Sequence, residues 1–375
     1  MMELRGARIA ALDRIVSDLL QRPDGPPGAC LAISAGGNQV FSAGGRTRMF
    51  DETGPVDGED MDLDTRTDIG SVTKIAATTM ALMALIDAGE LDVRARVRDV
   101  LSWTAGRPIG EATIMDLLQH RAGLWEWWPT YLVPGDPLEV VSGLPLRYPI
   151  GHGRHYSDLG FMLLGAVLET ATGEGLARAV TRLVLRPVAL EHTAYGTPVP
   201  GAPVAASSRG DSIEREMVRT GVPYPVRYDR DAYDGWRERV LLGEVNDGNA
   251  YHSFGSTAGH AGLFSSAADL LTLGEAVGAS LVGCGPISPE TAAAFLQAGP
   301  DPCQALGFRV WELGTTQAFG HTGFPGVAFA VLPEFSVSAV LVTNRLHVAG
   351  TPIAVEPWWL ETLSMIAEHG AAPWR

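Results

Sequence analysis

Lysine is nearly absent from this 375-residue sequence, and cysteine is scarce. Of the 28 Lys and Arg residues, all but Lys74 are arginine. The three cysteines, Cys30, Cys284 and Cys303, are odd in number and far apart, which argues against a disulfide framework and favours a reducing compartment. A general preference for arginine explains the missing lysines, but it does not explain where the one lysine stands.

Positive charge and long apolar runs are also in short supply. The net charge of −15 argues against nucleic acids and anionic membrane surfaces as partners. The longest apolar candidate, residues 161–168, is far shorter than a membrane span. Residues 1–20 carry charges between apolar residues at helical spacing, which indicates an amphipathic helix and no export signal. We therefore expect no nucleic-acid partner, no membrane partner and a cytoplasmic location.

The signatures of several other chemistries are missing as well. The sequence contains no complete Gly-x-Gly-x-x-Gly pattern, no phosphate-binding P-loop, no His-Glu-x-x-His and no Gly-x-Ser-x-Gly. His152 and His155 are three residues apart, but no acidic or cysteine partner stands at metal-binding spacing. We therefore expect neither a metal site nor a cofactor.

The stretch from Asp68 to Lys74 carries the strongest chemical signal. It leads into the apolar run 75–85 and predicts a helix over 72–88, with Ser71 at or near its N-cap. Ser71 and Lys74 are three residues apart, so both side chains emerge on one face. A lysine desolvated beside a second cation can approach neutrality and act as a base, whereas arginine cannot. The pair therefore predicts a nucleophilic serine activated by Lys74, with the helix N-terminus favouring an oxyanion.

Strands are expected near both termini, with helices between them. The expected elements are strands over 28–34 and 39–43, a loop over 44–66, helices over 111–120, 157–171 and 175–186, an irregular excursion over 196–235, strands over 327–332 and 337–343, and a closing helix over 356–369. This order predicts a sheet completed by both termini with an inserted helical lobe. We expect residues 1–70 and 300–375 to form the sheet lobe, residues 71–299 the mostly helical lobe, and the active site to lie between them.

Three motifs follow one another in a recognisable order. They are Ser71-Val72-Thr73-Lys74, Tyr156-Ser157-Asp158 and His321-Thr322-Gly323, with further matching stretches at 117–124, 259–264 and 342–345. The chain resembles the serine β-lactamase and penicillin-binding protein superfamily, above all its class C branch of D-alanyl-D-alanine carboxypeptidases, esterases and acyltransferases. The resemblance implies an α/β (α+β) fold of the β-lactamase/transpeptidase type, in which helices flank an antiparallel sheet.

The resemblance also implies roles for single residues. Tyr156 corresponds to the general base and acid that relays the serine proton to the leaving group, and an adjacent lysine ammonium favours phenolate. The backbone N–H groups of Ser71 and Phe324 would form the oxyanion hole, and Gly323 would leave room for the substrate backbone.

Asp158 departs from the pattern, because relatives usually carry asparagine there. Asparagine can donate to a substrate amide carbonyl, whereas an ionised aspartate can only accept. We therefore expect β-lactams to be poor substrates. An Asp158 paired with Lys74 would also hold the lysine charged and weaken it as a base.

Other candidate substrate-binding residues surround these motifs. His321 stands where many relatives carry lysine, and Thr322 follows it in the motif. His321 could assist the proton relay, or bind a substrate carboxylate when protonated. A hydrogen-bonded structural role fits a lone histidine better. Trp125 and Trp127 follow the stretch 117–124 and could form an aromatic wall at the mouth of the site, or pack in the core.

These observations predict a serine acyl-enzyme hydrolase that acts on a small ester or amide. An acyltransferase that passes the acyl group from Ser71 to an amine or alcohol acceptor is the first alternative, because it uses the same intermediate. A non-catalytic binding protein on the same fold is the second, should Asp158 disable the site. The sequence predicts no oligomeric state.

Overall fold

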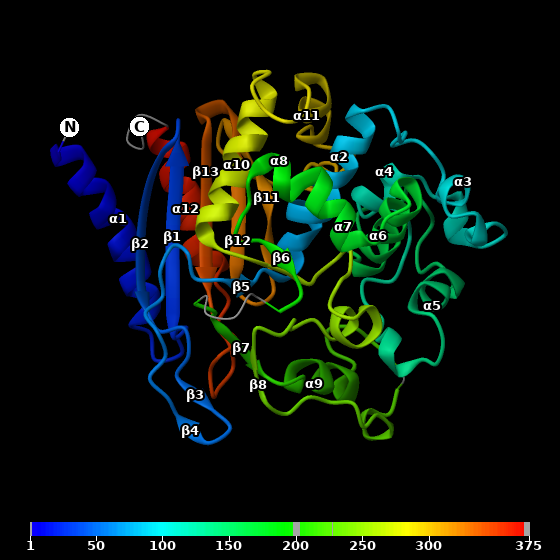
Figure 1. Cartoon of the computed structure of the whole chain (residues 1–375), viewed down its shortest axis with the longest axis horizontal. Helices are drawn as coiled ribbons and strands as arrows, with labels where there is room; N and C mark the ends of the chain where they lie inside the picture. Colours follow the sequence, from blue (N-terminus) through cyan, green and yellow to red (C-terminus); the bar gives the residue numbers. More distant parts are fainter. Residues whose placement is uncertain (1, 198–202, 227, 371–375) are drawn as a thin grey trace.

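Strands from both ends of the chain pair in one six-stranded antiparallel sheet (Figure 1). The computed structural model describes residues 2–197, 203–226 and 228–370. The strand order is β10-β11-β12-β13-β1-β2, and β1 pairs directly with β13. The strands are β1 (Gly28–Ala35), β2 (Asn38–Gly45), β10 (Arg309–Leu313), β11 (Thr316–Gly323), β12 (Val327–Leu332) and β13 (Val337–Thr343). The predicted sheet completed by both termini is confirmed.

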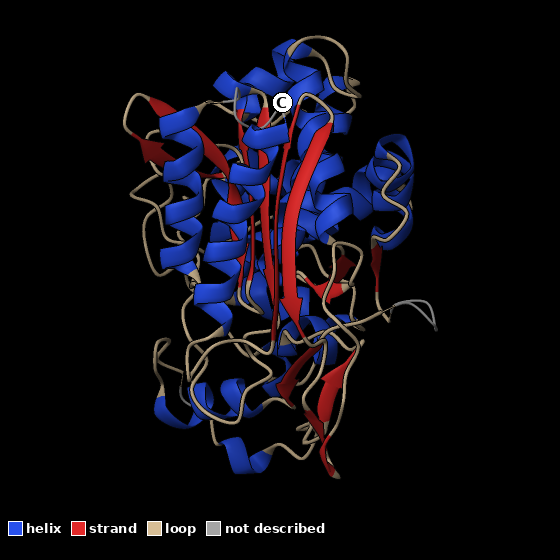
Figure 2. Ribbon diagram, turned by 90° about the vertical axis from the view of Figure 1, so that its left-hand side faces the viewer, coloured by secondary structure: helices blue, strands red, loops and turns tan. Residues whose placement is uncertain are grey.

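Both faces of this sheet are covered, which explains why β1 reads as an unbroken run of small and apolar residues. Its odd-numbered residues pack with helices α1 (Met2–Leu20) and α12 (Glu356–His369), while Cys30 and Ala32 face the core on the other side. Figure 2 shows two helices lying along one face of the sheet. On the opposite face, α10 (Ala267–Leu281) packs against β13 and β1. Successive side chains of β1 point to opposite faces of the sheet, so the strand contributes to two hydrophobic cores.

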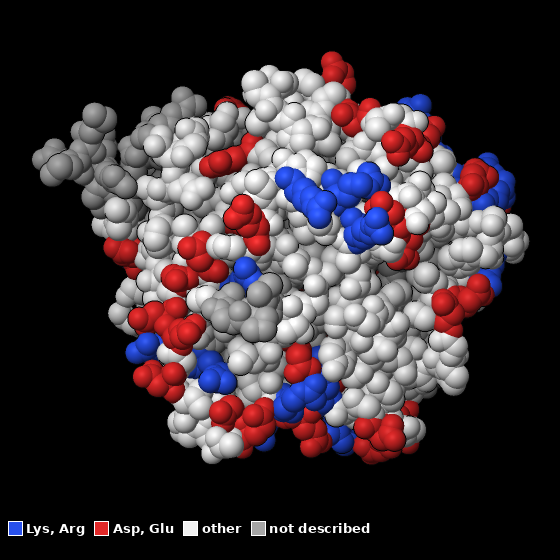
Figure 3. All heavy atoms as spheres, in the orientation of Figure 1, with Lys and Arg blue, Asp and Glu red and all other residues white. Residues whose placement is uncertain are grey.

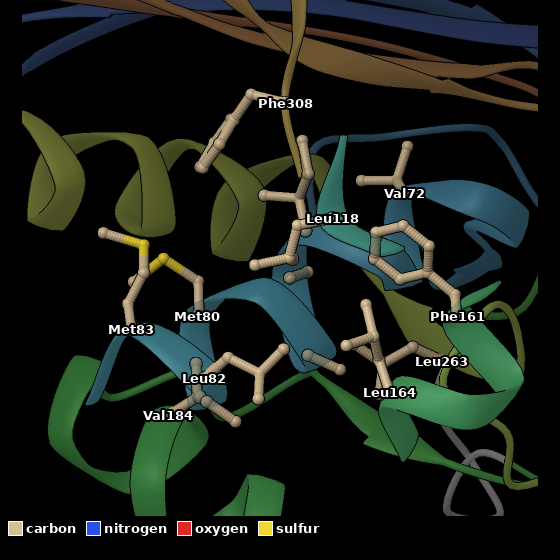
Figure 4. Close-up of a cluster of buried hydrophobic side chains, with 14 of the residues drawn as sticks. Val72, Met80, Leu82, Met83, Leu118, Phe161, Leu164, Val184, Leu263 and Phe308 are labelled. Atoms are coloured by element: carbon tan, nitrogen blue, oxygen red, sulfur yellow. The ribbon is translucent and has the colours of Figure 1, made fainter. Parts of the chain in front are cut away.

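A larger hydrophobic core lies among the helices of the middle segment. Met80, Leu118 and Phe161 meet there from three different helices (Figure 4). These helices are α2 (Met80–Asp87), α3 (Val97–Val100), α4 (Ile114–Leu118), α5 (Pro137–Gly143), α6 (Asp158–Thr172), α7 (Leu176–Val180), α8 (Arg186–Val188) and α11 (Pro289–Phe295). The boundaries of the two lobes proposed from the sequence stay a prediction.

The helix that carries Ser71 begins differently from the expectation. A 3₁₀ turn over Gly70–Val72 is followed by a π-helical turn over Lys74–Thr79 and then by α2. The residue at the cap is Ile69, so Ser71 lies inside the first turn and caps nothing. Gly70 has φ +50°, and a Cβ there would clash with Pro325. The tight turn depends on glycine and leaves the Ser71 hydroxyl free for other partners.

The segment 196–235, expected to be irregular, contains regular structure. Helix α9 (Ser212–Thr220) and strand β7 (Ala206–Arg209) lie within it. Asp211, one of the charges that argued for an exposed loop, is buried in an ion pair with Arg237, which composition alone cannot reveal. Residues 198–202 and 227 lie outside the described part. The remaining short strands are β3 (Phe50–Asp51), β4 (Gly54–Pro55), β5 (Thr67–Asp68), β6 (Ala194–Tyr195), β8 (Val240–Leu242) and β9 (Leu263–Ser265).

The surface reflects the acidic composition. In Figure 3, acidic side chains are spread over the face shown, and basic side chains form separate small groups between them. Across the described ranges, we find no helix with the length and apolar character required to span a membrane.

Candidate active site

Ser71 is held in place by the carboxylate that precedes it. Asp68, at the end of β5, is buried and accepts hydrogen bonds from the backbone N–H groups of Gly70 (2.8 Å) and Asn246 (2.6 Å). Burial raises the pKa of Asp68 to about 6. The carboxylate thereby ties the turn before Ser71 to a distant loop and leaves the half-buried serine at the edge of a cavity.

The serine hydroxyl contacts both expected catalytic partners. Lys74 Nζ donates to Ser71 Oγ at 2.9 Å, and the Tyr156 hydroxyl donates to the same oxygen at 3.0 Å. Tyr156 directly precedes Ser157, which caps helix α6 by accepting from the Gly160 N–H at 3.3 Å. The structure therefore brings Tyr156 to Ser71 and Lys74, although Tyr156 lies 85 positions after Ser71 in the sequence.

Lys74 is wholly buried and has acceptors on every side. Besides Ser71, its ammonium donates to the carbonyl of His260 at 3.1 Å and lies 2.6 Å from Asp158 Oδ1. Burial lowers the pKa of Lys74, but the adjacent charge of Asp158 leads the opposing influences, and the net shift is above the ordinary value. The structure differs here from the expectation of a near-neutral lysine, because Asp158 holds the ammonium charged.

Tyr156 is half-buried, and its phenol keeps its proton. Burial raises the pKa of Tyr156 to about 12, with the Lys74 ammonium opposing the shift and Asp158 adding to it. The Lys74 ammonium favours phenolate, as expected, but burial outweighs it. Asp158 thus raises the pKa of both side chains that contact the serine hydroxyl, Lys74 and Tyr156.

The end of β11 lies directly against the turn that carries Ser71. A Cβ on Gly323 would clash with the carbonyl of Ile69, and a Cβ on Gly70 would lie 3.3 Å from the Phe324 nitrogen. Two glycines thus permit the close approach of the two backbone segments. The segments that carry the N–H groups of Ser71 and Phe324 are in contact, as an oxyanion hole requires.

His321 lies in the site but as a neutral side chain. It is buried, its Nδ1 contacts the carbonyl of Thr322 at 2.7 Å, and its ring centroid is 5.7 Å from that of Tyr156. Burial, followed by the charge of Lys74, lowers the pKa of His321 to about 3. The expectation that a protonated His321 binds a substrate carboxylate does not fit, because the imidazole is neutral near pH 7.

The two tryptophans expected in an aromatic wall are placed differently. Trp127 is buried, stacks against Tyr224 with ring centroids 6.1 Å apart, and lines the cavity. Trp125 donates its indole N–H to the carbonyl of Pro145 at 2.9 Å and packs against Trp128. Trp125 is not among the residues that line this cavity within the described ranges, and its role at the mouth of the site stays a prediction.

The cavity at Ser71 has a volume of about 1290 Å³. Ser71, Tyr156, Asp158, His321, Thr322 and Phe324 contribute to its lining. Acidic side chains that the sequence reasoning missed contribute as well, namely Asp211, Glu214, Glu216 and Asp247. Burial and the charge of Asp247 raise the pKa of Glu214 to about 8. Three of these acids lie in the segment 196–235, which the sequence predicts to be irregular. No motif spacing marks them as neighbours of the site.

A second buried ion pair joins Asp211, one of these acidic residues, to Arg237. Arg237 donates through Nε to Asp211 Oδ1 at 3.0 Å and through another nitrogen to the carbonyl of Val245 at 2.8 Å. Asp211 Oδ2 also accepts from the Arg237 backbone N–H at 2.8 Å and contacts His252 Nε2 at 3.0 Å. Every charged atom of this pair has a partner within the protein, and none contacts Ser71.

Comparison with known proteins gives this geometry a context. A family model described as Beta-lactamase matches residues 12–361. The chain is 28% identical over 377 residues to the N-acetylmuramyl-L-alanine amidase of Bacillus subtilis (strain 168), covering 91% of this chain and 82% of the relative. It is 30% identical over 319 residues to a protein of Escherichia coli (strain K12) assigned by name as a D-alanyl-D-alanine carboxypeptidase, covering 76% of this chain and 70% of the relative.

A solved structure shares the fold at lower identity. The crystal structure of a class C beta lactamase from Rhodobacter sphaeroides superposes with a TM-score of 0.68 at 20% identity, covering 96% of this chain and 98% of the other. The mixed architecture of helices and antiparallel sheet predicted from the motifs is confirmed by this likeness.

Proposed function

The chain belongs to the Beta-lactamase family, and we propose that it is a serine acyl-enzyme hydrolase that cleaves a small amide or ester with Ser71, Lys74 and Tyr156. One observation carries the proposal. The Ser71 oxygen lies within 3.0 Å of both the Lys74 ammonium and the Tyr156 hydroxyl at the edge of the cavity. A nucleophile, a fixed cation and a proton carrier are thereby within reach of one another.

The protonation states favour a proton exchange through Tyr156. Lys74 is charged and Tyr156 is neutral at rest, so neither is a free base. As Ser71 Oγ attacks the carbonyl carbon, Tyr156 gives its proton to the leaving group and takes the serine proton in return. No phenolate or free amine accumulates. The Lys74 charge stabilises the negative charge that develops on Ser71 Oγ and on the Tyr156 oxygen.

The substrate class follows from the relatives and the site together. The curated relatives are named as an amidase and a carboxypeptidase, which favours amide bonds over esters. The cavity of about 1290 Å³ accepts a small molecule or a short peptide. The cytoplasmic location expected from the sequence stays a prediction.

Covalent labelling tests the proposal. A fluorophosphonate should add once to the wild-type protein, on Ser71, and intact-protein mass spectrometry should find no adduct on Ser71→Ala. Ser212→Ala is the matched control, because Ser212 is an exposed serine that lines the same cavity. Labelling that survives Ser71→Ala, or an unlabelled wild type, contradicts the assignment, and the second result favours a non-catalytic binding protein.

Acyl transfer uses the same intermediate and differs only in what attacks it. A substrate turned over with and without an added amine separates the two. Release of acid alone supports the hydrolase, whereas amide formation in place of acid supports the transferase.

A further inference from the structure

Three arginines line the cavity beside Ser71, and their guanidinium groups differ in their contacts. Arg309 pairs with Glu356 at 2.7 Å. Arg345 donates to two backbone carbonyls, at 2.9 and 2.8 Å. Arg154 stands apart, because no carboxylate of the described chain lies within 4.0 Å of its guanidinium.

A fixed amide holds Arg154 by one edge. Gln304 is buried, and its amide nitrogen donates to the carbonyls of Ala305 (3.0 Å) and Phe308 (2.9 Å). Its oxygen is therefore held in place to accept from Arg154 Nε at 2.9 Å. Within the described ranges, the two terminal nitrogens of this guanidinium donate to no protein acceptor. The donors of the arginine fork are thus positioned and left free.

An unpaired, partly buried cation is costly unless a ligand completes it. Burial lowers the pKa of Arg154, and the charge of Asp301, which lies beyond hydrogen-bonding distance, opposes this shift without cancelling it. The free edge of a guanidinium matches a carboxylate, which can accept two parallel hydrogen bonds. The ligand that fits Arg154 is therefore a carboxylate.

Arg154 lines the same cavity as Tyr156 and His321. It lies two residues before Tyr156, and after burial and Lys74 its charge is among the influences that lower the pKa of His321. Tyr156 is the residue that delivers a proton to the leaving group in the proposed reaction. Because Arg154 shares the cavity with this proton carrier, the leaving group is the part of the substrate that we assign to it.

We infer that Arg154 binds a carboxylate carried by the leaving group of the substrate, an inference that rests on the proposed function. The bond from Ser71 Oγ to the acyl carbon forms while the acyl C–N or C–O bond breaks. The departing amine or alcohol takes the Tyr156 proton, and the serine proton passes to Tyr156. The released product is a small acid such as an amino acid. Arg154 takes the carboxylate role that neutral His321 cannot fill.

Two matched thioesters test the inference. Both carry an N-acetylalanyl group, and they differ only in the leaving thiol, which is mercaptoacetate in one and neutral mercaptoacetamide in the other. A chromogenic thiol reagent follows release. The wild type should prefer the carboxylate in kcat/KM by about 10- to 100-fold, as a charge-assisted pair of hydrogen bonds provides.

The variants separate Arg154 from its neighbours. Arg154→Gln should bring the preference close to one while turnover of the neutral thioester stays within a few-fold. Arg154→Lys should restore only part of the preference, because an ammonium lacks the planar fork. Arg309→Gln is the matched control and should keep the full preference, because Arg309 lines the same cavity but is occupied by Glu356.

Two outcomes overturn the inference: a wild type without preference, or an Arg154→Gln variant that keeps it. Fluorophosphonate labelling of Ser71 reports the proposed function separately, since that probe carries no carboxylate. If Ser71 is labelled but neither thioester turns over, the two compounds are compared as competitors of labelling. In the wild type, the carboxylate thioester must then protect Ser71 from labelling at about tenfold lower concentration than the neutral thioester does. In Arg154→Gln, the two thioesters must protect at equal concentrations.

Discussion

Two buried ion pairs lie around the cavity, and they differ in what surrounds them. The side chains of Arg237 and Asp211 are 3% and 1% exposed, and fixed groups of the protein take up their remaining hydrogen-bonding capacity. The side chains of Lys74 and Asp158 are 0% and 16% exposed. Lys74 gives one of its three donors to a reactive hydroxyl, and Asp158 faces the cavity.

The difference indicates what each pair is for. A closed pair between fixed partners holds two segments together, and it can change only at the expense of the fold. The Lys74–Asp158 pair is open, because it contacts Ser71 and faces the cavity, and it controls protonation where a substrate binds. We therefore expect substitutions in the first pair to affect stability and substitutions in the second to affect rate.

Loss of the lysine charge should have the largest effect. Lys74→Met removes the ammonium that contacts Ser71 and stabilises negative charge, so acylation should slow by about 10²- to 10⁴-fold. Stopped-flow or mass-spectrometric acylation rates with one activated ester measure the loss. The melting transition should change less, because Asp158 can turn to water in the cavity.

Lys74→Arg sharpens the same comparison. The pKa of Lys74 is raised, so the charge matters more than a free amine, and arginine should retain more activity than methionine. Equal loss in both variants would instead indicate that a titrating amine is required. Circular dichroism checks that the larger guanidinium is accommodated.

The closed pair should respond in stability. Arg237→Met leaves Asp211 buried without its cation, which should lower the free energy of unfolding by about 3–5 kcal/mol. Urea denaturation measures the change, and fluorophosphonate labelling of the fraction that remains folded should persist. Arg239→Met is the matched control, since Arg239 pairs with Glu244 while half-exposed and should cost less than about 1 kcal/mol. A similar loss in both variants would contradict the distinction.

The sheet and its flanking helices could be predicted because their signals are local. Strands 327–332 and 337–343 and the helix 356–369 have the bounds that apolar runs and breakers indicate. Order and spacing of the motifs also identified the fold. Local patterns carry this information because periodicity reports which faces are buried.

The rest depends on contacts between distant residues. Asp211 and Arg237 meet across 26 positions. A charged stretch that reads as a surface loop instead carries helix α9, of which residues 212–214, 216 and 217 line the cavity. Asp158 was singled out as a departure, but only its 2.6 Å approach to Lys74 decides the protonation of the site. The unpaired edge of Arg154 is likewise visible only once Gln304 is placed.

The smallest expected effect is the most informative about the open pair. In Asp158→Asn the carboxylate that raises the pKa of Lys74 is gone, while burial still lowers it. The pKa of Lys74 should therefore fall. Activity that needs the charged lysine is complete below that pKa and is lost as pH rises through it, so the alkaline limb of kcat/KM should move to lower pH than in the wild type.

The asparagine should also change substrate preference, because it can donate to an amide carbonyl where aspartate can only accept. We expect the ratio of nitrocefin to ester turnover to be low in the wild type and to rise about tenfold in Asp158→Asn, the size of one hydrogen bond to a polar partner. Asp158→Ala separates the two causes, since it removes the charge without supplying a donor. It should reproduce the shifted pH profile but not the gain in nitrocefin turnover. Wild-type nitrocefin hydrolysis as fast as that of the best ester would show that Asp158 does not restrict β-lactams.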